Sequence, residues 1–266
     1  ITWETQGNFN VGFDFDLFRG RLSGSVDFFT RKTTDMLFSF PLPPSYGYTS
    51  YYANVGDMKN TGLEIDLKAT PVKTKDFEWN VNLNFTTYEN KVSYLPEERK
   101  TYTVDGKRGY TSGNYFYGED CALYTFHMRK YAGVDPQTGK SMWYYDATQQ
   151  KVDANNQPVF EMENGAPKLD ANGNQIPVME TVKKTTTEYA DADYYLCGTA
   201  LPDAYGGFGT SLYWKGFDLS IDFSFQIGGQ VYDGDYASMM GSPTANSKGR
   251  NIHADMLNAW TASNNS

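Results

Sequence analysis

YGGFGTSLYWKGFDLSIDFSFQIG, residues 205–228, is the most informative stretch of this chain. Two stretches that alternate residue by residue flank the dipeptide Lys215-Gly216. Strand side chains project to opposite sides in turn, so each stretch predicts a strand with one apolar and one polar face. In the second stretch the apolar face carries Phe217, Leu219, Ile221, Phe223, Phe225 and Ile227, and the polar face carries Asp218, Ser220, Asp222, Ser224 and Gln226.

The alternation runs for longer than a soluble strand requires. Strands of soluble proteins are usually about 5–6 residues long, whereas a tilted strand that crosses a bilayer needs about 9–11. Residues 217–227 alternate without interruption. The hairpin therefore favours an antiparallel transmembrane β-barrel, whose apolar face is covered by lipid.

Four further segments repeat this pattern, within residues 8–18, 21–28, 63–69 and 79–85. Their apolar positions are Phe9, Val11, Phe13, Phe15 and Leu17; Leu22, Gly24, Val26 and Phe28; Leu63, Ile65, Leu67 and Ala69; and Trp79, Val81, Leu83 and Phe85. Hydrophilic residues fill the alternate positions, and a barrel interior is polar. We expect Asp14, Asp16, Asp27, Asp218 and Asp222 to line that interior, in contact with water, neighbouring strands, a plug or cargo.

The connections between these segments differ sharply in length. Arg19-Gly20, residues 71–76 and Lys215-Gly216 are short, whereas 34–57, 93–202 and 229 onward are long. Outer-membrane barrels have short periplasmic turns and long extracellular loops. Aromatic residues collect at the interfaces of such barrels, and the residues beside the short turns that predict a periplasmic aromatic girdle are Phe18, Phe77, Trp79, Trp214 and Phe217.

The organisation of residues 93–202 is left open by the sequence. Residues 121–133 and 140–145 favour strands around the turn 135–139, DPQTG. The related stretches 153–158 and 170–177 are rich in Asn, Asp and Pro, which favour turns between short hairpins. Either the region adds a further pair of membrane strands, or it is mostly an extracellular region with short hairpins. In total we expect about six to eight barrel strands within residues 1–266.

The composition agrees with a folded protein that presents much aromatic surface. Of the 266 residues 16% are aromatic, while the hydrophobic fraction is only 39%. The formal net charge of −9 argues against nucleic acid and against anionic membrane surfaces as partners, because binding to either demands a basic surface. The chain starts at Ile1 without a signal sequence, so we expect a piece of a longer protein.

The two cysteines, Cys121 and Cys197, are too few for a disulfide scaffold, and the sequence does not decide whether they are bridged.

In its phrases and their order the chain resembles the SusC/RagA family of TonB-dependent outer-membrane transporters. The matching stretches are FNVGFDFDLFRGRLSGSVDFFTRKTTDML (9–37), NVGDMKNTGLEIDLKATPV (54–72), FEWNVNLNFTTYENKV (77–92), YAGVDPQTGKSMWYYD (131–146) and ALPDAYGGFGTSLYWKGFDLSIDFSFQIGG (200–229). The likeness covers most of the chain except about residues 147–190. The phrase HADMLNAWT (253–261) is similar to the family's segment before its last strands, which are expected after Ser266.

The resemblance implies the partners and the transport activity. It implies a plugged barrel of about 22 strands, with the plug and the TonB-contacting segment in an N-terminal part absent from residues 1–266. It further implies a SusD-like lipoprotein as partner, and TonB-driven import of oligosaccharides or oligopeptides across the bacterial outer membrane.

No arrangement of residues predicts catalysis, a metal site or a cofactor. His127 and His253 have no suitably spaced partners for a metal, and the glycines of 206–209 lie inside a strand pattern without a following helix. Asp170, Asn172 and Asn174 resemble the start of a calcium loop, but Thr181 stands where that loop needs Glu. We therefore predict a transporter and not an enzyme.

Two aromatic clusters in the long connections are the candidate contact sites. They comprise Tyr46, Tyr48, Tyr51 and Tyr52, and Tyr115, Phe116 and Tyr117. Tyrosine combines an apolar ring with a hydroxyl group, which suits stacking on sugars or contact with a protein partner. The structural alternative is that these rings pack loop against loop or form the outer girdle.

Two other classes of protein remain as alternatives at this stage. A soluble β-sandwich that serves as a glycan-binding or adhesin module would also alternate, but with its apolar face buried against a second sheet. An outer-membrane barrel hydrolase would need a nucleophile and a base that project together, and the sequence offers no such set.

Overall fold

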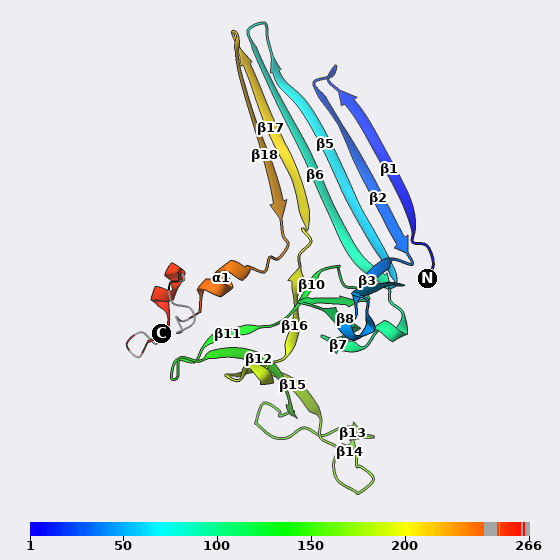
Figure 1. The fold of residues 1–266 in the computed structure, drawn as a ribbon, viewed down its shortest axis with the longest axis vertical. Helices are drawn as coiled ribbons and strands as arrows, with labels where there is room; N and C mark the ends of the chain where they lie inside the picture. Colours follow the sequence, from blue (N-terminus) through cyan, green and yellow to red (C-terminus); the bar gives the residue numbers. More distant parts are fainter. Residues whose placement is uncertain (242–248, 250, 262, 264–266) are drawn as a thin grey trace. The chain divides into compact units, whose positions relative to one another are not determined.

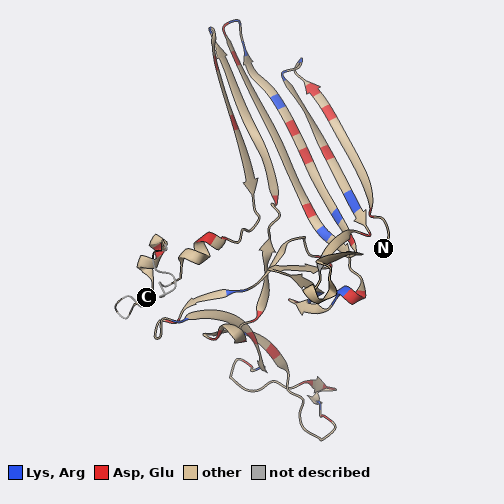
Figure 2. Cartoon of the chain, in the orientation of Figure 1, with Lys and Arg blue, Asp and Glu red and all other residues tan. Residues whose placement is uncertain are grey.

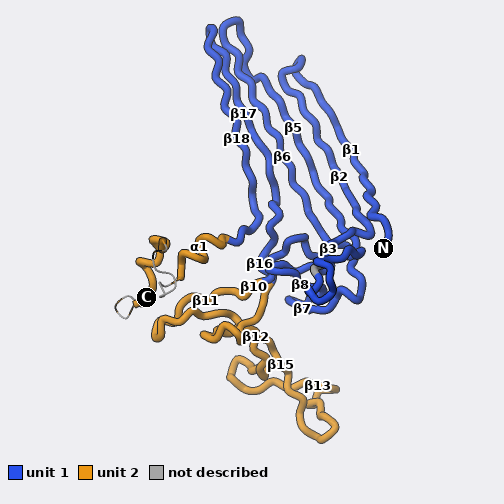
Figure 3. The backbone as a smooth tube through the Cα atoms, viewed as in Figure 1, with its two compact units in different colours: residues 1–127, 196–232 blue, residues 128–195, 233–266 orange. Residues whose placement is uncertain are grey.

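The computed structural model describes residues 1–241, 249, 251–261 and 263. The chain divides into two units, each described by itself (Figure 3). Unit 1 comprises residues 1–127 and 196–232, and unit 2 comprises residues 128–195 and 233–266. Within the described residues no helix has the length and apolar character needed to span a membrane.

Unit 1 is built on a six-stranded sheet in which all neighbours are antiparallel (Figure 1). The spatial order is β1-β2-β5-β6-β17-β18. These strands are β1 (Thr5–Leu17), β2 (Leu22–Thr34), β5 (Asp57–Lys73), β6 (Phe77–Tyr94), β17 (Ala204–Trp214) and β18 (Phe217–Ile227). Each predicted alternating segment forms one of these strands, and most strands extend beyond the predicted bounds.

The register aligns apolar residues in rows that cross the whole sheet. One row is Phe13, Val26, Ile65, Phe85, Gly206 and Phe225, and the next is Phe15, Gly24, Leu67, Leu83, Phe208 and Phe223. The apolar rows begin with the row that contains Phe77 and end with the row that contains Thr87. At about 3.3 Å per residue and a tilt of about 40°, the apolar band is about 25 Å tall, as outer-membrane barrels require.

The apolar face remains uncovered. Leu219 and Ile221 are 53% and 40% exposed, and Val11 and Phe223 are likewise exposed, with Leu83 half-buried. A β-sandwich would bury these side chains against a second sheet, so the sandwich alternative is wrong.

The opposite face is polar in the same register. Asp14, Ser25, Asp66 and Asn84 form one row, and Asp16, Ser23, Lys68, Asn82, Gly209 and Asp222 form the next. Figure 2 shows Asp and Glu distributed along β1, β2 and β5. A hollow of about 550 Å³ lies on this face beside Asp14, Asp16, Asp66 and Lys68.

Two glycines on the apolar face make room for neighbouring aromatic rings. A Cβ at Gly24 would meet the ring of Phe15 at 2.9 Å, and one at Gly206 would meet Phe225 at 3.0 Å as well as the carbonyl of Asn84. Phe15 and Phe225 are the direct cross-strand neighbours of these glycines. The glycines thus let rings lie over the sheet where a side chain would push strands apart.

The short turns lie where the sequence predicts them, and the β17–β18 turn has the predicted length. Lys215 and Gly216 have φ values of 47° and 91°, and both central residues of a type I′ hairpin turn need positive φ. The first turn is longer than Arg19-Gly20 alone, because Leu17 pairs with Leu22 and Phe18 also has positive φ.

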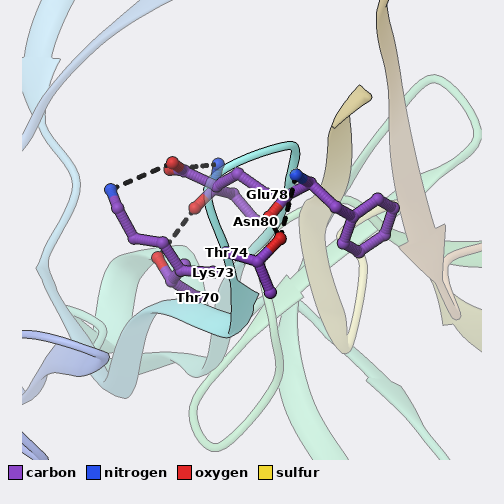
Figure 4. A network of polar contacts seen from close by, with 6 residues as sticks. Thr70, Lys73, Thr74, Glu78 and Asn80 are labelled. Atoms are coloured by element: carbon purple, nitrogen blue, oxygen red, sulfur yellow. Dashed lines mark hydrogen bonds and ion pairs between the residues drawn. The ribbon is translucent and has the colours of Figure 1, made fainter. Parts of the chain in front are cut away.

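The turn between β5 and β6 is held by a polar network (Figure 4). Thr70 Oγ1 donates to Asn80 Oδ1 at 2.7 Å, Asn80 Nδ2 donates to Glu78 Oε1 at 3.2 Å, and Lys73 Nζ lies 2.9 Å from Glu78 Oε2. The register shifts between Ala69 and Val72. This bulge accommodates Pro71, which has no N–H for a ladder; the predicted connection at 71–76 therefore narrows to 74–76.

Residues 95–203 add no strand to the six-stranded sheet. β6 pairs directly with β17, from Thr87 opposite Ala204 to Phe77 opposite Trp214. The region instead contributes a five-stranded sheet of order β16-β10-β9-β8-β7. Its elements are η2 (Glu97–Arg99), β7 (Tyr102–Val104), β8 (Lys107–Ser112), β9 (Tyr115–Gly118), β10 (Thr125–Arg129) and β16 (Tyr194–Thr199).

Unit 2 contains a three-stranded sheet, an exposed arm and a short C-terminal helix. The sheet has the order β11-β12-β15. The elements are β11 (Tyr131–Val134), β12 (Ser141–Gln150), β13 (Met162–Glu163), β14 (Ala166–Pro167), β15 (Met179–Thr186), η3 (Tyr189–Asp191), α1 (Gly234–Met239) and η5 (Ala254–Asn258). The predicted turn at 135–139 joins β11 to β12, and the Gly139 amide donates to the Asp135 carbonyl at 2.8 Å.

Candidate functional site

The first predicted tyrosine cluster lies on a hairpin of β3 (Leu37–Pro41) and β4 (Ser50–Asn54), joined through η1 (Pro44–Tyr46). Pro43 and Pro44 preset the backbone before Tyr46, and Gly47 ends the turn with φ of 73°. Tyr46, Tyr48, Tyr51 and Tyr52 are all exposed, up to 76% for Tyr48. The hairpin thus presents four rings to the surroundings.

The base of the hairpin is anchored firmly. Asn54 Nδ2 donates to the carbonyls of Asp35 and Thr2, at 2.6 and 3.1 Å, and Asn54 Oδ1 accepts from the Thr2 amide at 2.9 Å. The Leu37 amide donates to Glu4 Oε2 at 3.1 Å, and Val55 is 2% exposed. These contacts limit the conformational freedom that the hairpin would lose on binding a partner.

The second cluster, on β9, is mainly structural. Phe116 is 0% exposed and packs with Val104, Cys121 and Leu196 in a small core. Tyr117 is also buried, stacked on Tyr110 at 5.2 Å. Only Tyr115 is partly accessible, against the rings of Tyr124 and Phe126.

The ionisable groups of this core have shifted pKa values. Burial raises the pKa of Tyr117 to about 12 and raises the pKa of the Cys121 thiol, while burial lowers the pKa of His127. Each shift favours the neutral form, as a low-dielectric environment does. Cys121 and Cys197 are not joined by a disulfide bond.

The structure brings the two clusters together through residues that the sequence did not single out. The rings of Phe38 and Tyr117 lie 6.1 Å apart, which joins the hairpin to β9. Arg99 Nη2 donates to the Tyr51 hydroxyl at 3.5 Å. These contacts are non-local, and no spacing in the sequence indicates them.

A third aromatic cluster, also missed, lies in unit 2. Arg129 stacks between the rings of Tyr189 and Tyr194, at 4.1 and 4.6 Å, and Trp143 packs edge-on against Tyr131 and Tyr189. Arg129 Nε also donates to the Ala192 carbonyl at 3.1 Å. The cluster fixes η3 beside β12.

The weak calcium pattern has a structural explanation. Asp170 Oδ1 accepts the amides of Asn172 and Asn174, and Asp153 Oδ1 likewise accepts those of Asn155 and Gln157. In both stretches the carboxylate closes a turn. Among the residues that the structure describes, no three His, Cys, Asp or Glu side chains gather as metal ligands would.

Comparisons with known proteins agree with this geometry. The family described as "TonB dependent receptor-like, beta-barrel" matches residues 1–232. TonB-dependent receptor P3 of Formosa agariphila is 30% identical over 267 residues, covering 99% of this chain and 24% of that relative. TonB-dependent receptor SusC of Bacteroides thetaiotaomicron is 27% identical over 234 residues, covering 87% of this chain and 20% of SusC.

Solved structures give the same result. The structure of the RagAB peptide transporter superposes with a TM-score of 0.74 at 30% identity, covering 100% of this chain and 26% of that one. The RagAB peptide importer in an "open-open" state superposes with a TM-score of 0.71 at 28% identity, covering 100% of this chain and 25% of that one. The chain therefore spans about a quarter of the length of these relatives.

These findings confirm the predicted resemblance to SusC/RagA receptors and the predicted partial barrel. The family consists of receptors and not of enzymes, and its members reside in the outer membrane of Gram-negative bacteria, as the sequence predicted. The chain belongs to the TonB-dependent receptor β-barrel family, of the SusC/RagA type.

Proposed function

We propose that this chain forms part of the wall of an outer-membrane importer for oligosaccharides or oligopeptides. The observation that carries the proposal is the two-faced six-stranded sheet, apolar on one side and polar on the other. The likeness to SusC and to the RagAB peptide transporter supports it. Import would draw energy from TonB, through parts of the receptor outside these 266 residues.

In this proposal residues 93–202 are mostly extracellular, and a SusD-like lipoprotein contacts the receptor there. The hairpin tyrosines Tyr46, Tyr48, Tyr51 and Tyr52 contact the lipoprotein or the cargo, with Tyr115 at the margin. Support comes from their exposure on an anchored hairpin. Phe116 and Tyr117 are excluded from the contact set because they are buried.

The transport proposal is tested by uptake in cells. A strain that lacks the full receptor is complemented with the wild-type gene and supplied with labelled oligosaccharides or oligopeptides, with and without TonB. Import of one class that needs both the receptor and TonB is expected. Unchanged uptake of both classes without the receptor would contradict the proposal.

The contact site is tested by replacing Tyr46, Tyr48 and Tyr52 with Ala in the full receptor. Fewer than about 30% of contact residues cost more than about 1 kcal/mol when truncated, but tyrosine is enriched among them, so loss of three rings should lower uptake at low cargo concentration at least tenfold. Tyr232→Ala is the control, because Tyr232 is comparably exposed but lies outside the hairpin. Equal uptake by both variants would show that the hairpin tyrosines do not contact the lipoprotein or the cargo.

A further inference from the structure

The pairing of β6 with β17 stops before β6 ends. Thr87 lies opposite Ala204 in the last pair of that ladder, whereas β6 continues well beyond it. Farther along β6, the Val92 amide donates to the Cys121 carbonyl at 2.9 Å, and the Val92 carbonyl accepts from the Asp120 amide at 3.0 Å. The edge of β6 that faces β17 is therefore paired up to Thr87 and again at Val92, with a gap between them.

The gap lies beside the main-chain groups of Tyr88 and Asn90. Alternate residues of an antiparallel strand direct their N–H and C=O groups to the same side, so Tyr88 and Asn90 share the side on which Val92 forms its hydrogen bonds. Among the strands that the structure describes, none pairs with β6 on this side between Thr87 and Val92. A strand edge of this kind is a template for a further strand.

A groove opens at this gap. It has a volume of about 630 Å³, and residues 87–91 of β6 line it together with Asp120, Ala122 and the segment 201–203. Three residues of an extended strand fill a block about 10 Å long, about 10 Å thick and about 4.8 Å wide, which is about 480 Å³. The groove is therefore large enough for about three extended residues.

The groove carries an excess of negative charge. Its charged side chains are those of Glu89, Asp120, Asp203 and Lys91, so three carboxylates and one ammonium group leave an excess of two negative charges. Lys91 Nζ lies 2.7 Å from Glu89 Oε1, so Asp120 and Asp203 provide this excess. An anionic group would be repelled here, whereas a lysine or arginine side chain would gain charge-assisted hydrogen bonds.

The groove also has an apolar part. Its apolar side chains are those of Phe28, Leu63, Ala122, Leu201 and Pro202. Lysine and arginine lay their methylene groups along apolar surface and keep the charged end among polar groups. Carboxylates beside an apolar surface therefore favour a basic residue within an extended peptide segment.

The position of the groove argues for a protein anchored in the same leaflet of the membrane. Phe28, Leu63 and Thr87 form the last apolar row, on the face that we expect lipid to cover. Lys91 lies four residues farther along β6, about 10 Å higher after allowing for tilt, at the level where lipid headgroups begin. Cargo would enter the lumen on the opposite face of the wall, whereas the chain of a surface lipoprotein must rise from its lipid anchor through this level.

We propose that the groove binds a short extended segment of the SusD-like lipoprotein, which follows its lipid anchor and carries lysine or arginine. The segment adds to the edge of β6 through hydrogen bonds with the main chain of Tyr88 and Asn90, as in other complexes formed by strand addition. Its basic side chains contact Asp120 and Asp203. This inference rests on the lipoprotein partner proposed above and adds where and how that partner is held.

The test is photocrosslinking in outer membranes that contain the full receptor and its lipoprotein. A photoreactive phenylalanine analogue replaces Phe28, which lines the groove, and in a second receptor it replaces Phe223, which is comparably exposed in the middle of the apolar face. Crosslinked peptides are identified by mass spectrometry. The analogue at position 28 should crosslink to the residues that follow the lipid anchor of the lipoprotein, and the analogue at position 223 should not.

Charge variants test the contact with basic side chains. Asp120→Asn with Asp203→Asn keeps the shape of both side chains and removes the excess charge, so the crosslink yield at position 28 should fall about fivefold. Glu163→Gln with Asp191→Asn removes the same charge from exposed positions of unit 2 and is the matched control, with no expected effect. Replacing the lysines and arginines of the crosslinked segment with Gln should reproduce the loss.

Hydrogen exchange tests strand addition separately from side-chain contact. The Tyr88 and Asn90 amides should exchange more slowly in the complex than in the receptor alone, because the added strand would accept their hydrogen bonds. The Asn82 amide, in the part of β6 that pairs with β17, is the control and should exchange equally in both.

Four results would overturn the proposal. They are crosslinks from position 28 only to lipid, to cargo or to other parts of the lipoprotein; equal yields from the aspartate variant and its control; unchanged exchange at Tyr88 and Asn90; and absence of any lipoprotein from the purified receptor. The transport proposal fails differently, through cargo uptake that does not need the receptor.

Discussion

Asp153 and Asp170 perform the same task in two loops of unit 2. Each carboxylate accepts two backbone amides from the following four residues, at 2.8 and 2.9 Å. The hydrogen bonds from Asn174 and Asn172 lower the pKa of Asp170 below its usual value. A side chain that satisfies backbone donors in this way replaces ladder hydrogen bonds that so short a hairpin lacks.

The lowered pKa predicts how the Asp170 loop responds to acid. Because the folded-state pKa lies below the unfolded value, the stabilisation is fully present above about pH 4 and is lost as the pH falls through the folded pKa. Hydrogen exchange at the Asn172 and Asn174 amides, corrected for intrinsic rates, should therefore accelerate below about pH 4. Asp170→Ala should show fast exchange at neutral pH, and Asp170→Asn, which keeps an acceptor, should exchange more slowly than Asp170→Ala. Identical exchange in all three proteins would contradict this role.

A second prediction at this scale concerns Gly206. A Cβ at this position would collide with the Asn84 carbonyl across the β6–β17 pair. Gly206→Ala should therefore destabilise the full receptor by about 1–3 kcal/mol, seen as a lower temperature for loss of compact mobility on SDS gels. Gly7→Ala is the matched control, since its nearest neighbour is the Lys32 carbonyl at 4.0 Å. If both variants lose compact mobility at the wild-type temperature, the close approach at Gly206 is unimportant.

At the scale of elements, the short turns determine the register of each hairpin. In the β17–β18 hairpin Trp214 pairs with Phe217, so only Lys215 and Gly216 form the loop. The Lys215 amide also donates to the Asp76 carbonyl of the β5–β6 turn at 3.0 Å. A slip by one residue would move every apolar side chain of β18 to the polar face.

Two substitutions in the β17–β18 turn should change the stability of the receptor in opposite directions. Gly216→Ala places a side chain at φ of 91° and should cost about 1–2 kcal/mol. Lys215→Asn installs the Asn-Gly pair that type I′ turns prefer and should stabilise the hairpin by about 0.5 kcal/mol. Refolding midpoints of the full receptor in urea and detergent report both effects, and shifts of the same sign would refute the turn assignment.

At the scale of the whole molecule, local and non-local features were predictable to different degrees. Period-two alternation is local, so the strand content and faces of 217–227 or 8–18 follow from the residues themselves. The pairing of β6 with β17 is non-local: Thr87 Oγ1 donates to the Asp203 carbonyl 116 residues away. For this reason the sequence left open whether residues 93–202 contribute membrane strands, although the turns within that region could be predicted.

The candidate site shows the same division. The exposed tyrosines of 46–52 follow from prolines and tyrosines in one short loop, and the structure exposes them. Phe116 sits in an equally aromatic stretch, yet it is buried, because β8 and β10 flank β9 and Val104, Cys121 and Leu196 pack against the ring.

The two faces of the sheet predict contrasting tolerance to charge. Leu83 lies in the middle of the apolar band, and its neighbour Asn82 lies on the polar face. Leu83→Arg should destabilise the receptor by about 2–4 kcal/mol, whereas Asn82→Arg should have little effect. Yield of folded receptor in outer-membrane fractions provides the comparison, and equal yields would count against lipid on the Leu83 side.

We expect lipid to cover the apolar face of the six-stranded sheet, while water or a plug meets the polar face. Spin labels replace Leu83 and Asn82, one at a time, in a full receptor that carries Cys121→Ser and Cys197→Ser. Their collision rates with oxygen and with a water-soluble nickel chelate in membranes distinguish lipid from water around each label. The label at 83 should collide readily with oxygen and rarely with the nickel chelate, which is the behaviour of a label surrounded by lipid. The label at 82 should not show this behaviour. Shielding of the label at 83 from both reagents would show that protein, not lipid, covers this face.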